Sequence, residues 1–206
     1  VNFLEPGSKA ASFANGYFSD RLTEMARRQR AEVVRLEKPW GEVFTDAEAE
    51  EFIAREKPAV VAFVQAETST GAYQKGHGIA RAAHAHGALV IMDCVTSLGG
   101  MPVEVDAAGI DIAYSGTQKA LGCPPGLAPI TVSPRALDWL RHGPTTPASW
   151  YLDLKLLLDY YESAHRYHHT APISMFYALR ESLELVKEEG LEARFDIEAI
   201  ASPSGV

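Results

Sequence analysis

The chain has 206 residues, of which 47% are hydrophobic and 22% charged, which suits one globular domain, or one domain and part of another. Its net charge of −8 argues against a nucleic-acid-binding surface, which needs a basic patch. No apolar run approaches the roughly 20 residues of a membrane span, and the presence of only two cysteines argues against a disulfide framework. We therefore expect a cytoplasmic protein, with a peroxisomal or mitochondrial location as the open alternatives.

The chain begins with a helix signal followed by a strand signal. Ser19 and Asp20 are good capping residues and predict the start of a helix. Residues 31–36 then read as a strand. These are the first elements of an alternating pattern.

The alternation continues with a second helix and strand. Thr45 and Glu48 have the spacing of a capping box, which predicts a helix that ends before Pro58. Residues 59–64 are apolar and rich in β-branched side chains, as expected for a buried strand.

The middle of the chain completes the pattern. A helix from about residue 78 is predicted to stop at Gly87, a common residue after a helix end. Residues 88–92 and 111–114 are short apolar runs typical of strands buried on both faces of a parallel sheet. Residues 128–133 predict a final strand. The alternation indicates an α/β fold, a mostly parallel sheet sandwiched by helices.

Beyond residue 133 the pattern becomes helical and irregular. Residues 172–189 predict an amphipathic helix that ends at Gly190. Its apolar side is expected to comprise Ile173, Phe176, Leu179, Leu183 and Val186.

Polar residues follow two of the predicted parallel strands. Asp93 ends one strand, and Lys119 follows the other after the polar run 115–118. In open α/β sheets the ligand crevice lies at the carboxyl ends of the strands, so both side chains are expected to face one pocket. A carboxylate and an amine held apart in this way suit pyridoxal phosphate, with the lysine as Schiff-base residue and the acid on the pyridine nitrogen. The ordinary alternative is a turn aspartate and a solvated lysine.

Four motifs carry a more specific signal. They are Asp-Cys-Val-Thr-Ser-Leu-Gly-Gly at 93–100, Gly-Ile-Asp-Ile-Ala-Tyr-Ser-Gly-Thr-Gln-Lys at 109–119, Pro-Pro-Gly-Leu at 124–127 and Tyr-His-His-Thr-Ala-Pro at 167–172. Together they resemble the alanine–glyoxylate / serine–pyruvate aminotransferase family, class V of the fold-type I pyridoxal phosphate enzymes. The resemblance covers about residues 4–195 and implies the large-domain fold of those enzymes, with an antiparallel strand at 128–133.

The resemblance also implies a domain organisation. Residues 1–165 would form part of the large cofactor-binding domain, and 166–206 the interdomain helix and the start of a smaller C-terminal domain. The phosphate loop and the carboxylate-binding arginine of the family are expected outside this chain. We therefore expect an internal piece of a longer enzyme, weak or inactive when isolated. A catalytically incomplete scaffold is the alternative.

The family assigns catalysis to two of the chain's residues. Lys119 would form the Schiff base and then move a proton, which requires desolvation and a nearby cation to lower the pKa of its amine. Asp93 would hold the ring nitrogen. Val95 and Phe18 would pack on the two ring faces, and Phe18 stands where many relatives have tryptophan.

The remaining cofactor contacts are also implied by the family. Ser69 is the candidate for the hydroxyl beside the ring oxygen or imine, although an ordinary Ser/Thr turn explains it equally well. Gln118 would contact the phosphate. Tyr167 and Thr170 would reach the phosphate of a neighbouring subunit, which implies a homodimer with shared active sites.

The resemblance implies transfer of an amino group from alanine or serine to glyoxylate or pyruvate. A class V lyase such as a cysteine desulfurase is the alternative, although those enzymes usually have histidine where this chain has Gln118. The histidines at 84–86 and 165–169 lack the partners of a metal site, so we expect none. No nucleic-acid or membrane partner is expected.

Overall fold

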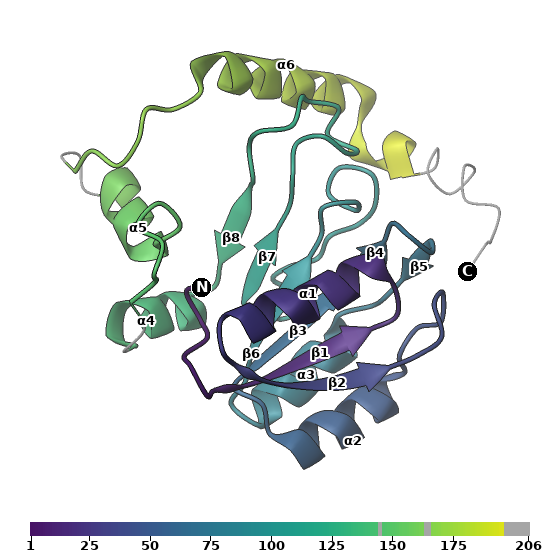
Figure 1. Ribbon diagram of the computed structural model, residues 1–206. Helices are drawn as coiled ribbons and strands as arrows, with labels where there is room; N and C mark the ends of the chain where they lie inside the picture. The colour runs from purple at the N-terminus through teal and green to yellow at the C-terminus, as the bar shows by residue number, and fades with distance from the viewer. Residues whose placement is uncertain (144–145, 163–165, 196–206) are drawn as a thin grey trace.

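The computed structural model describes residues 1–143, 146–162 and 166–195 (Figure 1). The first half of the chain contains β1 (Lys9–Ala14), α1 (Tyr17–Arg28), β2 (Glu32–Glu37), α2 (Asp46–Glu56), β3 (Val60–Val64), β4 (Ala66–Glu67), β5 (Ala72–Tyr73) and α3 (His77–Ala85). The second half contains β6 (Leu89–Asp93), β7 (Ile112–Tyr114), β8 (Ile130–Val132), α4 (Pro134–His142), α5 (Leu154–Glu162) and α6 (Ile173–Glu189).

Six strands form one sheet in the order β2-β1-β3-β6-β7-β8. All neighbours pair in parallel except β7 and β8, which are antiparallel. The predicted α/β class and the antiparallel final strand are confirmed. The two short strands β4 and β5 form a separate hairpin beyond the end of β3, which the sequence analysis did not anticipate.

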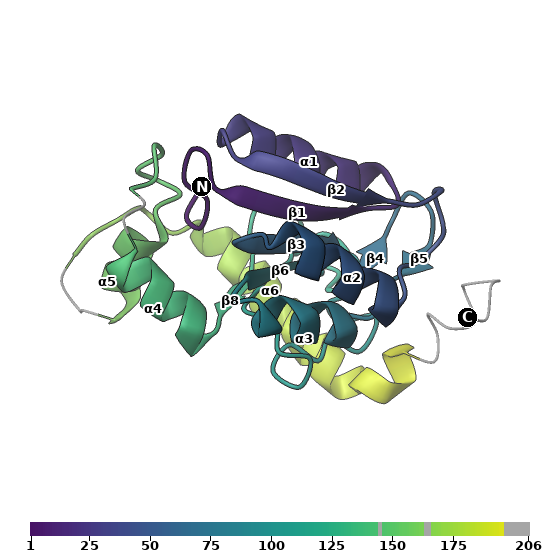
Figure 2. The same cartoon turned by 90° about the horizontal axis from the view of Figure 1, so that it is seen from below.

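Helices cover both faces of this sheet (Figures 1 and 2). Alternate side chains of a strand point to opposite faces. Phe13, Val61 and Val90 therefore pack with α2 and α3 in one core cluster. Val60 packs on the other face with residues of α4, such as Leu140. Because both faces of the central strands are buried, their sequences are apolar throughout. This continuous apolar pattern identified them as strands in the sequence.

Helix α1 begins earlier than predicted, and Ser19 and Asp20 do not cap it. The helix starts at Tyr17 after Gly16. Ser19 lies in the first turn, where its Oγ accepts hydrogen bonds from the N–H groups of Asn15 and Gly16, both at 3.0 Å. A carboxylate from a distant strand caps the helix instead, as described below, and local sequence cannot reveal such a cap.

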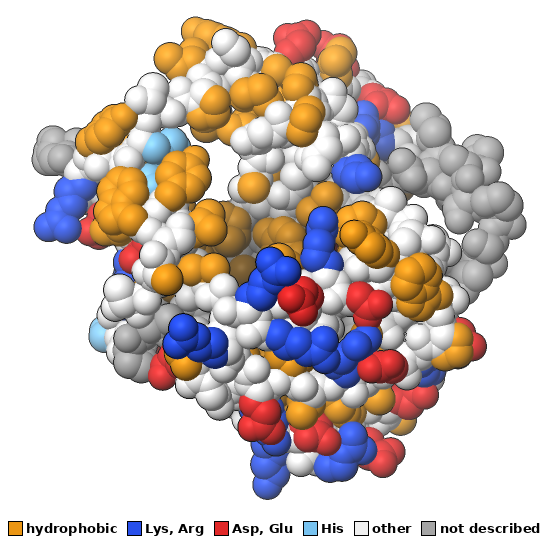
Figure 3. Space-filling model, viewed as in Figure 1, with side chains coloured by type: hydrophobic (Ala, Val, Ile, Leu, Met, Phe, Trp, Pro, Cys, Tyr) orange, Lys and Arg blue, Asp and Glu red, His pale blue; other side chains and the backbone are white. Residues whose placement is uncertain are grey.

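Helix α6 has the predicted bounds but not the predicted burial. It ends at Gly190, whose φ is +84°. On its expected apolar side, Ile173 is 62% exposed, Phe176 45% and Leu183 43%, whereas Val186 is buried. Apolar side chains gather over this helix in Figure 3. The sequence pattern identified the helix, but the described residues do not cover its apolar face.

Candidate functional site

The carboxyl ends of the parallel strands β3, β6 and β7 meet at one edge of the sheet. Their last residues are paired, Val64 with Asp93 and Asp93 with Tyr114. A pocket opens there, which we call the edge pocket. It is lined by Phe18, Arg21, Val64, Ala66, Thr68, Asp93, Val95, Thr96 and Lys119. The structure thus brings Asp93 and Lys119 together with Phe18 and Val95, the four residues expected around a cofactor ring.

Asp93 is the buried carboxylate of the edge pocket and is 5% exposed. One oxygen, Oδ1, accepts a hydrogen bond of 2.9 Å from the backbone N–H of Val95. The other, Oδ2, accepts one of 2.7 Å from the Tyr114 hydroxyl. Burial raises the pKa of Asp93, and the two hydrogen bonds and the charge of Arg21 oppose that rise.

Tyr114 was not singled out by the sequence analysis. It stands beside Asp93 in the neighbouring strand, so both side chains lie on the same face of the sheet. Burial, reinforced by the charge of Asp93, raises the pKa of the Tyr114 phenol, which therefore remains a hydrogen-bond donor at neutral pH. The register of β6 and β7 makes this contact, and register is not visible in one strand's sequence.

Arg21 is a second residue that the sequence analysis missed. It lies one helical turn after Phe18, and its guanidinium carbon stands 4.6 Å from the centre of the Phe18 ring. Both side chains line the edge pocket. The predicted helix began at Ser19, after Phe18, so the helical spacing of Phe18 and Arg21 was not available as a signal.

Glu67 holds the first turn of α1 in place. Its carboxylate accepts hydrogen bonds from the N–H groups of Phe18, at 3.1 Å, and Ser19, at 2.9 Å, and is 1% exposed. A carboxylate is favourable at this position because it meets the positive end of the helix dipole. A Cβ at Gly16 would lie 2.3 Å from the Glu67 Cγ, so only glycine fits this approach. Glu67 therefore fixes the backbone that carries Phe18.

Ser69 does not line the edge pocket. Its hydroxyl donates to Glu67 at 2.7 Å and accepts from the N–H of Tyr17 at 3.0 Å, so it belongs to the cap of α1. Thr68 lines the pocket instead, together with Thr96, and their hydroxyls are 2.5 Å apart. Both residues lie in the turn between β4 and β5, and the turn directs only the Thr68 side chain to the pocket.

Lys119 lines the edge pocket but is exposed, so the described residues do not supply the desolvation expected of a Schiff-base lysine. It makes no hydrogen bond or ion pair to the parts of the chain described here. Its turn is held in place, because the backbone of Gly122 donates to the Lys119 carbonyl at 2.9 Å. Arg194, beyond α6, donates to the carbonyls of Gly99 and Ala120 and so ties the C-terminal segment to the same turn.

The predicted phosphate contacts lie outside the edge pocket. Gln118 is exposed and folds over Gly116. Tyr167 and Thr170 share a hydrogen bond of 2.6 Å between their hydroxyls, and both are exposed. Neither Tyr167 nor Thr170 lines the edge pocket of its own chain.

An aromatic and histidine cluster anchors the segment of Tyr167 and Thr170. His168 is 4% exposed and stacks on Trp150 with ring centres 4.3 Å apart. Its Nδ1 lies 2.9 Å from Nδ1 of His169. His165 is outside the described residues, and in the described part of the chain no group of three or more histidine, cysteine, aspartate or glutamate side chains could hold a metal ion.

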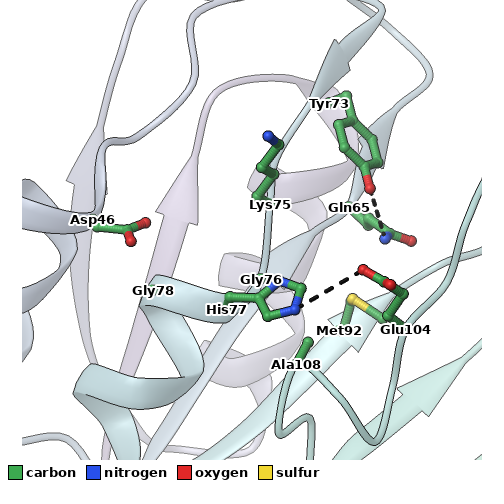
Figure 4. A pocket seen from close by; sticks show the side chains of 10 residues that line it. All are labelled: Asp46, Gln65, Tyr73, Lys75, Gly76, His77, Gly78, Met92, Glu104 and Ala108. Atoms are coloured by element: carbon green, nitrogen blue, oxygen red, sulfur yellow. Dashed lines mark hydrogen bonds and ion pairs between the residues drawn. The ribbon is translucent and has the colours of Figure 1, made fainter.

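A larger hollow of about 400 Å³ lies beside the start of α3. It is lined by residues that include Gln65, Tyr73, His77 and Glu104 (Figure 4). His77 and Glu104 are 3.9 Å apart, and the Gln65 amide donates to the Tyr73 hydroxyl at 3.4 Å. Asp93 and Lys119 do not line this hollow, and neither do Phe18 and Val95. The edge pocket is therefore the candidate site.

Comparisons with known proteins place the chain in a family. Residues 2–201 match the family model described as aminotransferase class V. The chain is 40% identical over 194 residues to the alanine–glyoxylate aminotransferase of Oryctolagus cuniculus, covering 93% of this chain and 50% of that protein. It is 40% identical over 214 residues to the (S)-ureidoglycine–glyoxylate transaminase of Bacillus subtilis, covering 95% of this chain and 51% of that one.

A crystal structure of an alanine–glyoxylate aminotransferase from Nostoc sp. superposes with a TM-score of 0.91 and 47% identity. It covers 95% of this chain and 52% of that chain. The chain thus spans about half the length of the relatives it matches. Within the described ranges, every helix is too short or too polar to cross a membrane.

Proposed function

This chain belongs to the class-V aminotransferase family, and on that premise we propose that the protein transfers an amino group from alanine or serine to glyoxylate or pyruvate with pyridoxal phosphate as cofactor. The family membership confirms the resemblance seen in the sequence. The observation that carries the proposal is the edge pocket, in which a buried carboxylate and a lysine face one space between apolar side chains.

The residues of the edge pocket fit this cofactor chemically. Asp93 has two oxygens with one intramolecular hydrogen bond each, which leaves lone pairs for a pyridinium N–H. Phe18 and Val95 supply apolar surface for a flat ring. Thr68 offers a hydroxyl, and Lys119 an amine without an ion-pair partner in the described ranges. Asp93, Phe18, Val95, Thr68 and Lys119 would therefore hold the ring.

When bound, pyridoxal phosphate supplies an aldehyde that takes up the amino group and a ring that withdraws electrons from the substrate Cα. Asp93 in its ionised form would keep the ring nitrogen protonated. Lys119 Nζ would remove the proton from Cα of the amino donor and, in the return half of the reaction, deliver a proton to Cα of the acceptor. Arg21 would favour the ionised form of Asp93 by its positive charge.

Two relatives support glyoxylate as the acceptor. The names of the rabbit and Bacillus subtilis proteins share glyoxylate and differ in the amino donor. We therefore propose a small 2-oxo acid as the acceptor, with glyoxylate as the preferred candidate. The proposed donor is alanine or serine. (S)-Ureidoglycine is the alternative donor that the experiment must exclude.

We further propose a homodimer in which Tyr167 and Thr170 bind the phosphate of the partner subunit's cofactor, and Gln118 binds the phosphate in its own subunit. Tyr167 and Thr170 are exposed and do not line the edge pocket of this chain, which supports the proposal. The exposed side chains of Trp150 and Phe176 provide apolar surface for such an interface.

The test is a spectral screen of half-reactions. The complete protein, loaded with pyridoxal phosphate, is mixed with alanine, serine, (S)-ureidoglycine or cysteine, and loss of the cofactor's visible absorbance reports amino transfer. We expect alanine or serine to convert the cofactor and glyoxylate to restore it, and the Lys119→Ala variant to do neither. Release of sulfide from cysteine without restoration by glyoxylate would overturn the proposal in favour of a lyase.

A further inference from the structure

The Asp93 carboxylate sits in an environment that opposes its charge. It is buried, and burial raises its pKa. The role proposed above requires the ionised form. Some group of the chain must therefore favour the carboxylate over the carboxylic acid at neutral pH.

The charged and titratable groups around Asp93 come from several elements. Arg21 of α1 lowers the pKa of Asp93 by its charge, and Glu67 of β4 raises it. Cys94 follows Asp93 in the chain and is buried. Lys119 lines the same pocket and, like Arg21, is exposed to solvent. The direct hydrogen bonds to the carboxylate come only from Val95 and Tyr114 within the described residues.

Each of these two hydrogen bonds goes to a different oxygen of the Asp93 carboxylate. The N–H of Val95 belongs to the backbone and binds Oδ1 at 2.9 Å. The hydroxyl of Tyr114 binds Oδ2 at 2.7 Å, and β-sheet pairing of Asp93 with Tyr114 fixes its position. A short hydrogen bond from a neutral donor to an ionised acceptor is stronger than one between neutral groups.

We infer that Tyr114 is a positioning residue for Asp93: its hydroxyl fixes the orientation of the carboxylate toward the edge pocket and favours its ionised form. The importance of this orientation for cofactor binding rests on the proposed function, but the hydrogen-bonded coupling between Tyr114 and Asp93 does not. Burial raises the pKa of the phenol, so Tyr114 keeps its proton and remains a donor while Asp93 titrates.

The variant that tests the inference is Tyr114→Phe, which keeps the ring in the sheet and removes only the hydroxyl. Tyr73→Phe is the matched control, because Tyr73 lines the hollow beside α3 and makes no contact with Asp93. The carboxyl pKa of Asp93 is measured in the cofactor-free complete protein by carbon NMR with labelled aspartate, and Asp93→Asn identifies the signal.

Tyr114→Phe removes a hydrogen bond to the charged Asp93 carboxylate. At 1.36 kcal/mol per pKa unit, this loss corresponds to a rise of about one to two units in the pKa of Asp93. We expect no shift in Tyr73→Phe. Replacement of Tyr114 by fluorotyrosine, a more acidic and stronger donor, should lower the Asp93 pKa. It provides the test if the phenylalanine variant fails to fold. An unchanged pKa in the phenylalanine variant, or in the fluorotyrosine protein, contradicts the inference.

Cofactor affinity supplies the second readout. Pyridoxal phosphate should bind Tyr114→Phe several-fold more weakly than wild type, and the loss should grow as pH falls toward the raised pKa of Asp93. Equal affinity and pH dependence in wild type and Tyr114→Phe contradict the inference. Failure of the wild type to bind the cofactor would instead overturn the proposed function, while a shifted Asp93 pKa would still support the coupling.

Discussion

The cap that Glu67 provides for helix α1 gives a sharp quantitative prediction. In Glu67→Gln, the side chain keeps its size but loses its charge, and an NH₂ group replaces one oxygen. That oxygen accepts hydrogen bonds from a buried helix terminus, such as the N–H of Ser19 at 2.9 Å. A buried N–H without a partner costs about 1–3 kcal/mol, and loss of a charge at a helix N-terminus about 0.3–1 kcal/mol.

Together these effects predict that Glu67→Gln lowers the free energy of unfolding of the complete protein by about 1–4 kcal/mol. Glu24→Gln is the control on the same helix, because Glu24 is 52% exposed and pairs with Arg28 at the surface. We expect that control to change stability by less than about 0.5 kcal/mol. Urea unfolding followed by circular dichroism measures both. Equal effects in the two variants would refute the assignment of Glu67 as the cap.

The remaining predictions concern the edge pocket and the partner subunit. Because the pKa of Asp93 is raised in the folded state, ionisation of Asp93 destabilises the folded protein as pH rises above the unfolded-state pKa near 3.9. Asp93→Asn should therefore stabilise the cofactor-free protein at pH 7, lose that advantage at pH 3, and abolish transamination. Thr68→Val should weaken cofactor binding more than Ser69→Ala, as measured by equilibrium dialysis, and the reverse order would restore Ser69 as the ring contact. Thr170→Ala should weaken cofactor retention by about 1.5–3 kcal/mol. Mixed dimers of Thr170→Ala with Lys119→Ala should recover one intact site, and absence of that recovery places both residues in one subunit.

The sequence was sufficient to predict which strand ends meet. Residues 88–92 and 111–114 are apolar because both faces of their strands are buried, and parallel strands end at a common edge. That reasoning brought Asp93 and Lys119 together without a structure. The resemblance to a family then added Phe18 and Val95, and the structure places all four on the edge pocket.

The residues that were missed depend on register and on contacts between distant segments. Tyr114 reaches Asp93 only through the pairing of β6 with β7. Glu67 caps α1 although it lies 48 residues after Ser19 in the sequence. Local sequence therefore indicated Ser19 as the cap. The choice between Ser69 and Thr68 required the geometry of the turn that follows β4, which has no periodicity for sequence to reveal.

The most direct test of the central claim is to locate the cofactor's covalent attachment. The complete protein is incubated with pyridoxal phosphate and reduced with borohydride, and the modified peptide is identified by mass spectrometry. The proposed site predicts one dominant label on Lys119 and its loss in Lys119→Arg, whose guanidinium forms no stable bond to the aldehyde. A dominant label on another lysine, or equal labelling of the Lys119→Arg variant, would contradict the assignment of the edge pocket as the active site.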